Sequence, residues 1–215
     1  GFPTRCQDKG DLKIREWVAN KVVAGKRNEA RVLQLRLKDG QDIELDVDGI
    51  TIRREENYLS ASLLENDTVG LIRVHDSLGE DELVNAFERV LPQMASTKAL
   101  IIDLRNTIHG GNTGVAEPIM GMLITEEKPY QLYEERKKKY LDYVQPEKPN
   151  YDKAVYVLVN RWTGSMGEGI AIGLNSMKRA TIVGTEMARL AGGMTDVGFK
   201  NHGYETSVSF MKIAD

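Results

Sequence analysis

An apolar run that leads directly into a glycine-flanked serine is the feature that most constrains how this chain can fold. The run Ala154–Val159 has the length and the β-branched content of a buried strand in a parallel sheet. The residues that follow, up to Leu174, alternate small and apolar side chains with helical spacing. Ser165 is therefore expected on a tight turn between the carboxyl end of a strand and the N-terminus of a helix. Backbone N–H groups and the helix dipole favour an oxyanion at such a place.

The serine turn alone does not define a catalytic site. Thr163 stands where a nucleophile elbow of the form Gly-x-Ser-x-Gly has its first glycine. A bare Gly-Ser-x-Gly sequence is more often an ordinary connecting turn. The position of the turn after a buried strand, together with a second turn of the same kind upstream, is what favours a nucleophile at Ser165.

The second turn follows another apolar run, Ala99–Ile102, and contains the pair Gly110-Gly111. A helix is expected after it, capped by Asn112 or Thr113. Its apolar residues are Val115, Ala116, Ile119, Met120 and Leu123.

Two strand–turn–helix units predict neighbouring strands whose turns meet at the carboxyl edge of one sheet. Gly110 and Gly111 would then bring a backbone N–H close to Ser165. With the N–H of Met166 it would form a two-donor oxyanion hole. The alternative is that both glycines only allow positive φ angles in a connecting loop.

Three segments together resemble the tail-specific (C-terminal-processing) serine peptidase family, which includes the tricorn-type core peptidases. They are Leu100–Asn106 with its following Gly-Gly-Asn, Trp162–Gly169 and Arg179–Thr185. The similarity extends from about Val69 to about Gly193. The resemblance implies an α/β fold with a crotonase/ClpP-like core.

The resemblance also implies roles for individual residues. Ser165 would be the nucleophile, and the N–H groups of Gly111 and Met166 would form the oxyanion hole. Gly110 and Gly164 would lie against the substrate. No metal and no cofactor is implied.

The chain departs from the best-known branch of that family, in which a lysine downstream of the serine acts as its base. Leu190 occupies the corresponding position, and the guanidinium of the adjacent Arg189 stays protonated and cannot act as a base. The tricorn-like branch instead uses a histidine from before a PDZ-like domain and a glutamate well downstream. Both positions would fall outside residues 1–215. We therefore expect a tricorn-like core that is incomplete at its C-terminus.

The N-terminal part is expected to be the end of a PDZ-like domain. Residues 11–25 have helical spacing with a glycine stop. Arg31–Leu37 and Ile43–Val47 alternate as the strands of a hairpin. The predicted organisation is a partial PDZ-like domain and linker over residues 1–55, followed by the peptidase core over residues 56–215.

Further elements are expected within the core. Val69–Val74 reads as a strand, and Glu80–Leu91 reads as a helix that Pro92 ends or bends. Residues 128–149 are polar, aromatic and interrupted by prolines, which predicts an excursion from the sheet. Its tyrosines would either pack the excursion onto the sheet or line a peptide groove. They are Tyr130, Tyr133, Tyr140 and Tyr143.

Composition narrows the class of partner. The net charge is −3 with both signs interspersed, so nothing indicates nucleic-acid binding. No apolar span reaches transmembrane length. Cys6 is the single cysteine, which excludes an intrachain disulfide and a cysteine metal cage.

The expected partner is a polypeptide substrate, and an oligomer is compatible with the sequence. The resemblance implies a bacterial protein of the periplasm or cell envelope, or a secreted one.

The three histidines are candidates for a base, since a serine nucleophile requires one. His75 and Asp76 are adjacent on an expected strand end, so their side chains should point apart. His202 lies in a turn-like Asn-His-Gly triplet. His109 directly precedes the oxyanion glycines and is the histidine to test. Glu168, three residues after Ser165, is expected to cap N–H groups or to orient the turn.

The leading hypothesis is a serine endopeptidase core with a nucleophile at Ser165 and its histidine and glutamate partners outside the chain. One alternative is a non-catalytic peptide-binding or scaffold protein on the same fold. A second is a crotonase-like acyl-thioester enzyme, whose oxyanion hole would stabilise an enolate.

Overall fold

The computed structural model describes residues 29–50, 57–135, 138–190, 192–199 and 204–214, with five single residues before them: Leu12, Arg15, Val18, Ala19 and Val23. Residues 135, 195–199 and 204–214 are described by their backbone only. The chain divides into two compact units, residues 1–54 and 55–215.

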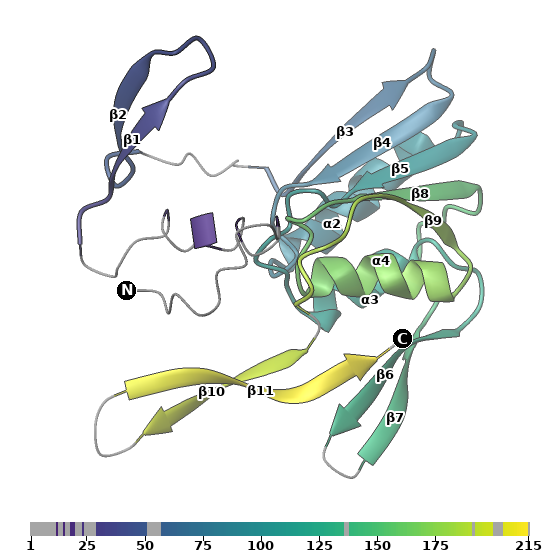
Figure 1. The fold of residues 1–215 in the computed structure, drawn as a ribbon. Helices are drawn as coiled ribbons and strands as arrows, with labels where there is room; N and C mark the ends of the chain where they lie inside the picture. Colours follow the sequence, from purple (N-terminus) through teal and green to yellow (C-terminus); the bar gives the residue numbers. More distant parts are fainter. Residues whose placement is uncertain are drawn as a thin grey trace. The chain divides into compact units, whose positions relative to one another are not determined.

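The centre of the second unit is a five-stranded sheet (Figure 1) with the order β3-β4-β5-β8-β9. β4 (Val69–Val74), β5 (Ala99–Asp103), β8 (Ala154–Val159) and β9 (Ala180–Gly184) run parallel, and β3 (Leu59–Leu64) pairs antiparallel with β4. The strands expected at 69–74, 99–102 and 154–159 are confirmed. As predicted, β5 and β8 are neighbours, so the turns that follow them lie at one edge of the sheet.

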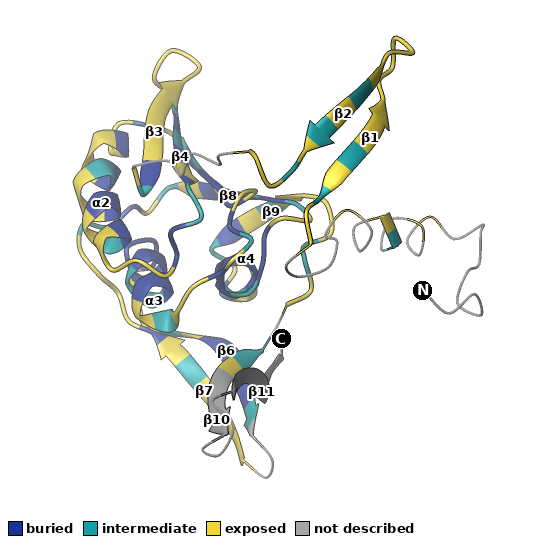
Figure 2. Ribbon diagram, turned by 90° about the vertical axis from the view of Figure 1, so that its left-hand side faces the viewer, coloured by how far each residue is buried: buried dark blue, intermediate teal, exposed yellow. Residues whose placement is uncertain are grey.

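Three helices lie along one face of this sheet: α2 (Glu82–Val90), α3 (Thr113–Gly121) and α4 (Met166–Ser176). Side chains on β4, β5 and β8 alternate between buried and partly exposed (Figure 2), as expected for a sheet covered more completely on one face. Ile72, Ile102 and Val157 are among the fully buried residues under the helices. The α-helical part ends at Val90, just before Pro92, and a 3-10 turn, η2 (Leu91–Met94), continues from it.

The excursion at residues 128–149 is more ordered than its composition indicates. It forms an antiparallel hairpin of β6 (Lys128–Glu135) and β7 (Lys138–Val144). With β10 (Gly193–Phe199) and β11 (Tyr204–Ala214) it builds a second sheet of order β10-β11-β6-β7. β6 contacts α4. The sequence of β6 does not show the alternation of buried and exposed residues that is typical of a strand, because a β-bulge at Tyr130 breaks the two-residue period.

The tyrosines of this hairpin divide into two pairs. Tyr130 and Tyr133 are buried, whereas Tyr140 and Tyr143 are exposed. Tyr130 packs on Gly173 of α4, so the excursion is anchored on a helix and not, as expected, on the sheet. The rings of Tyr133 and Tyr140 stack with centroids 5.1 Å apart.

In the first unit the structure shows a hairpin of β1 (Val32–Arg36) and β2 (Asp42–Asp46), as the alternation predicts. Ion pairs Arg36–Asp42 and Arg31–Asp48 lie along it. The helix expected over residues 11–25 lies almost entirely outside the described residues. The assignment of residues 1–55 to a PDZ-like domain stays a prediction.

Candidate active site

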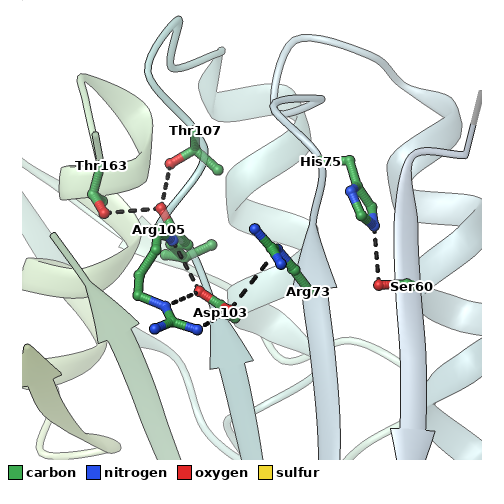
Figure 3. A network of polar contacts seen from close by, with 8 residues as sticks. Ser60, Arg73, His75, Asp103, Arg105, Thr107 and Thr163 are labelled. Carbon is green, nitrogen blue, oxygen red and sulfur yellow. Dashed lines mark hydrogen bonds and ion pairs between the residues drawn. The ribbon is translucent and has the colours of Figure 1, made fainter. Parts of the chain in front are cut away.

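The turns after β5 and β8 are joined by a dense set of hydrogen bonds. The hydroxyl groups of Thr107 and Thr163 both donate to the carbonyl oxygen of Leu104, at 2.9 and 2.8 Å. The backbone of Thr107 bonds to Trp162 on one side and to Gly164 on the other. Figure 3 shows the two threonines converging from the two turns. The two turns therefore form one rigid unit at the carboxyl edge of the sheet, as the sequence predicts.

Ser165 lies on this unit in an unusual backbone conformation. It is the residue before α4 and has φ +49° and ψ −116°, a region that residues with a side chain rarely occupy. Such a conformation costs on the order of 1–3 kcal/mol and is kept where the surrounding structure imposes it. A strained turn between strand and helix is the geometry of a nucleophile elbow, and here it arises although Thr163 replaces the first glycine.

Gly110 is in direct contact with the serine turn. Its φ is +66°, and a Cβ atom at this position would lie 2.4 Å from Ser165 Cβ and 3.0 Å from the backbone nitrogen of Met166. No side chain fits there. The neighbouring Gly111 is equally crowded, because a Cβ would lie 1.9 Å from the carbonyl oxygen of Leu78. The structure thus brings together three predicted site residues: Ser165, Met166 and Gly110.

The backbone N–H groups around Ser165 differ in whether they have acceptors. The Gly110 N–H donates to the carbonyl of Thr107 at 3.1 Å, and the Gly164 N–H donates to the same oxygen at 3.2 Å. The N–H groups of Gly111 and Met166 have no backbone acceptor among the described residues. These two were the expected oxyanion-hole donors, and that role stays a prediction.

The side chain of Glu168 stabilises the serine turn through hydrogen bonds. Its carboxylate accepts hydrogen bonds from three backbone N–H groups: Ser165 at 3.0 Å, Arg189 at 2.7 Å and Leu190 at 2.6 Å. The residue is only 4% exposed. A buried carboxylate is stable only when its charge is compensated, and here N–H dipoles do so. The expectation that Glu168 caps nearby N–H groups is confirmed.

Leu190 reaches the site through the same contact. Its Cδ1 atom lies 3.3 Å from the position that a Cβ of Gly164 would take. The N–H of Ala188 also donates to the carbonyl of Thr163 at 3.0 Å. Residues 188–190 therefore lie beside the serine turn, and an apolar side chain stands where the resemblance places a lysine.

The histidines are arranged differently from any simple pairing in the sequence. His109 pairs with Asp76: its Nδ1 contacts Asp76 Oδ2, and its backbone N–H donates to Asp76 Oδ1 at 3.0 Å. His75 instead lies with its Nε2 atom 3.0 Å from Ser60 Oγ. His75 and Asp76 do not pair, as expected for adjacent residues. His202 lies outside the described residues.

An ion-pair network stands at the end of β5. Asp103 is buried and receives two hydrogen bonds from the guanidinium of Arg105, with Arg73 3.9 Å away (Figure 3). Burial alone would raise the pKa of Asp103, but the bonds from Arg105 outweigh it and the pKa lies below its usual value. The charged network fixes the strand end from which the Gly110 turn departs.

Among the described residues, no three His, Cys, Asp or Glu side chains are grouped so that they could hold a metal ion. No helix in the described part of the chain has the length and apolar character to cross a bilayer.

Comparison with known proteins decides the family. The model of peptidase family S41 matches residues 68–210, about two thirds of the chain. The chain belongs to peptidase family S41. The resemblance to the tail-specific serine peptidases is thereby confirmed, and the match covers the serine turn, the Gly110 turn and the segment that contains Leu190.

Solved structures show the same fold at low sequence identity. The photosystem II D1 C-terminal processing protease superposes with a TM-score of 0.65 at 18% identity, over 88% of this chain and 52% of that one. Mature CPAF complexed with lactacystin gives 0.64 at 15% identity, over 86% and 59%. A lipoprotein from Streptococcus agalactiae gives 0.58 at 16% identity, over 96% and 73%. The S41 chain described here thus spans about half the length of the first two.

Several features of the candidate site were not predicted. Nothing in the sequence paired Asp76 with His109, because the two residues are 33 positions apart. The β-bulge of β6 was also missed, and with it the burial of Gln131 against α4. The contact of Leu190 with the serine turn was predicted only through the family resemblance.

Proposed function

We propose that this chain is the core of a serine endopeptidase in which Ser165 attacks a peptide carbonyl. The observation that carries the proposal is the strained conformation of Ser165, held between Gly110 and the Glu168 carboxylate at the start of a helix. The Ser165 Oγ atom lies beside Gly110, 2.9 Å from the position that a Cβ there would take. The N–H groups of Gly111 and Met166 have no backbone acceptor among the described residues.

The proposed chemistry begins with transfer of the Ser165 Oγ proton to a base as Oγ bonds to the carbonyl carbon. The carbonyl oxygen becomes an oxyanion, which the N–H groups of Gly111 and Met166 stabilise. One such donor is typically worth about 2.7–4 kcal/mol of transition-state stabilisation. Collapse of the intermediate releases the amine, which takes up a proton, and water then hydrolyses the acyl-enzyme.

The base is proposed to come from outside residues 1–215, in the tricorn-like manner. Two observations support this. Leu190 rather than a lysine stands beside Gly164, and the ring of His109 is directed to Asp76. Asp76 follows β4, whereas Ser165 follows β8, and β5 lies between these two strands. The histidine is therefore held toward the far side of the Gly110 turn.

The proposed substrate is an extended polypeptide that lies along the turn pair, in contact with Gly110 and Gly164. The proposed location is the bacterial periplasm or cell envelope, or outside the cell. Its support is the family resemblance and the fold shared with a streptococcal lipoprotein.

The experiment is hydrolysis of an unfolded protein, denatured casein, by the natural protein that contains this chain. We expect cleavage that Ser165→Ala abolishes while the thermal unfolding temperature is unchanged. Persistent cleavage by Ser165→Ala would overturn the proposal.

Leu190 in place of a lysine also favours a second candidate, a peptide-binding protein that has lost catalysis. In that case both forms would bind the casein chain and neither would cleave it. The S41 match favours both of these over an acyl-thioester enzyme.

A further inference from the structure

A buried carboxamide without a partner lies next to the serine turn. Gln131 on β6 is 4% exposed, and neither its Nε2 nor its Oε1 has a hydrogen-bond partner among the described residues. Leaving one such buried group unsatisfied costs about 1–3 kcal/mol. Natural folds keep few of them, and each calls for an explanation.

A β-bulge in β6 turns the side chain of Gln131 toward α4. Pro129 pairs with Tyr143 and Gln131 pairs with Asp142, so Tyr130 is the additional residue in β6. In a regular strand Tyr130 and Gln131 would face opposite sides. With the bulge both are buried, at 4% exposure each. Bulges are frequent next to active sites because they re-aim a side chain in this way.

Both side chains pack on glycines of α4, one turn apart. Tyr130 lies against Gly173, where a Cβ would be 3.0 Å from its ring. Gln131 lies against Gly169, where a Cβ would be 3.2 Å from Nε2. The difference is in their polar ends. The Tyr130 hydroxyl donates to Glu117 Oε1 at 2.7 Å, whereas the Gln131 amide has no equivalent partner.

Tyr130 keeps its proton in its pair with Glu117. Burial raises the pKa of Glu117, and burial also raises the pKa of Tyr130 far above its usual value. The hydroxyl therefore remains a donor at every physiological pH. The hydroxyl of Tyr130 is thus paired where β6 packs on α4, whereas Gln131 is unpaired among the described residues of this contact.

Met166 separates Gln131 from the nucleophile. A Cβ on Gly169 would lie 2.4 Å from Met166 Cε, so the methionine side chain folds back over Gly169 beside the Gln131 amide. Met166 is 7% exposed. Its side chain is unbranched and has three rotatable bonds, so it can leave this position at low cost. Its backbone N–H is one of the two proposed oxyanion donors.

We propose that Gln131 is the floor of a substrate side-chain subsite that Met166 covers, and that this subsite takes a carboxamide side chain on the acyl side of the scissile bond. This inference rests on the proposed function, because it requires Ser165 to be the nucleophile. The residue whose carbonyl meets the Met166 N–H is the substrate residue nearest to the Met166 side chain. A glutamine or asparagine there pairs with the Gln131 amide through one donor and one acceptor, which satisfies both orphan atoms.

The experiment compares covalent probes on the natural protein, on Gln131→Met and on the matched control Gln93→Met. Gln93 is an exposed glutamine on η2, remote from the serine turn. An alkyl fluorophosphonate reports the reactivity of Ser165 without using a side-chain subsite. Two peptidyl diphenyl phosphonates, with glutamine or norleucine analogues at the reacting residue, report the subsite. In each probe Ser165 Oγ bonds to phosphorus, fluoride or phenoxide leaves, and the serine proton passes to a base.

We expect the fluorophosphonate to label the natural protein and Gln93→Met at the same rate. For each protein the two phosphonate rates are divided by the rate of its own fluorophosphonate labelling, so that a change in the general reactivity of Ser165 does not count as a change in preference. The natural protein and Gln93→Met should react roughly tenfold or more faster with the glutamine phosphonate, because a site built for hydrogen bonds rejects an analogue that lacks them. Gln131→Met should prefer the norleucine phosphonate. It should also unfold at the same or a higher temperature, since it removes an unsatisfied buried group.

Fluorophosphonate labelling without a preference for glutamine in the natural protein would overturn the subsite and leave the proposed function standing. The same preference in Gln131→Met would also overturn it. A lower unfolding temperature for Gln131→Met, with no change in preference, would make the amide a structural group. No labelling by the fluorophosphonate would instead contradict the nucleophile itself.

Discussion

The carboxylate of Glu168 accepts a hydrogen bond from the backbone N–H of Ser165 at 3.0 Å, and the same carboxylate holds the N–H groups of Arg189 and Leu190. One buried side chain thus fixes the proposed nucleophile and the segment that crosses beside it. Loss of this contact should affect reactivity as well as stability.

Glu168→Gln replaces one of the two acceptor oxygens of the carboxylate by an NH₂ group, which cannot accept a hydrogen bond from a backbone N–H. We expect the free energy of unfolding to fall by about 1–3 kcal/mol, because at least one buried N–H loses its partner. The unfolding temperature should fall by about 2–4 °C per kcal/mol, and fluorophosphonate labelling of Ser165 should slow. Glu88→Gln, at an exposed position of α2, is the control. Equal stability of the two variants would contradict the role given to Glu168.

Gly110→Ala should block the site directly. The new methyl group would lie 2.4 Å from Ser165 Cβ, at a φ of +66° that disfavours alanine by about 1–2 kcal/mol. A displacement of the serine of the order of 1 Å is expected to lower the labelling rate about a hundredfold. Gly79→Ala provides the comparison, because a Cβ there meets nothing within 4 Å. Normal labelling of Gly110→Ala would show that Gly110 does not adjoin the reacting group.

The roles of His109 and Asp76 can be distinguished with two variants. In His109→Ala the backbone N–H of residue 109 still donates to Asp76, so the Gly110 turn should keep its position and labelling of Ser165 should change less than about threefold. Asp76→Ala removes both contacts and should slow labelling by roughly tenfold or more, as a displaced oxyanion donor would. Loss of labelling in His109→Ala alone would instead identify His109 as the base.

Much of this site could be predicted because its parts are local. The apolar runs before Gly110 and Ser165 fix β5 and β8, and parallel strands bring their turns to one edge. The sequence offered Asn112 or Thr113 as the capping residue of α3, and Asn112 is the one whose side chain accepts from the N–H of Val115. Contacts between residues far apart in the sequence could not be predicted from it.

The ion pair between Asp76 and His109 and the packing of Gln131 on Gly169 depend on how separate elements meet. The bulge at Tyr130 is the clearest case, since one additional residue reverses the face on which Gln131 lies. Pro129 is compatible with a bulge, an edge strand or a strand start, so it did not locate the additional residue.

Asp103 should contribute a pH dependence to stability. Its pKa is lowered in the folded chain, since the bonds from Arg105 outweigh the effect of burial. A carboxyl group of this kind stabilises the fold above its unfolded pKa of about 3.9, and that stabilisation is lost as the pH falls through the folded value. Asp103→Asn should therefore be less stable at pH 7 and should lose less stability on acidification.

Denaturant unfolding of both proteins between pH 7 and pH 2, with the exposed Asp67→Asn as the reference, measures this difference. Parallel pH profiles for Asp103→Asn and the natural chain would contradict the effect of Arg105 on Asp103.

Labelling with an alkyl fluorophosphonate, followed by mass-spectrometric mapping of the adduct, shows whether Ser165 is an activated nucleophile. The label should be read in the 215-residue chain and in the natural protein that contains it. We expect an adduct on Ser165 in the natural protein, absent in Ser165→Ala and much weaker in the 215-residue chain, where the proposed base is missing. A folded natural protein without an adduct on Ser165 would show that Ser165 is not an activated nucleophile.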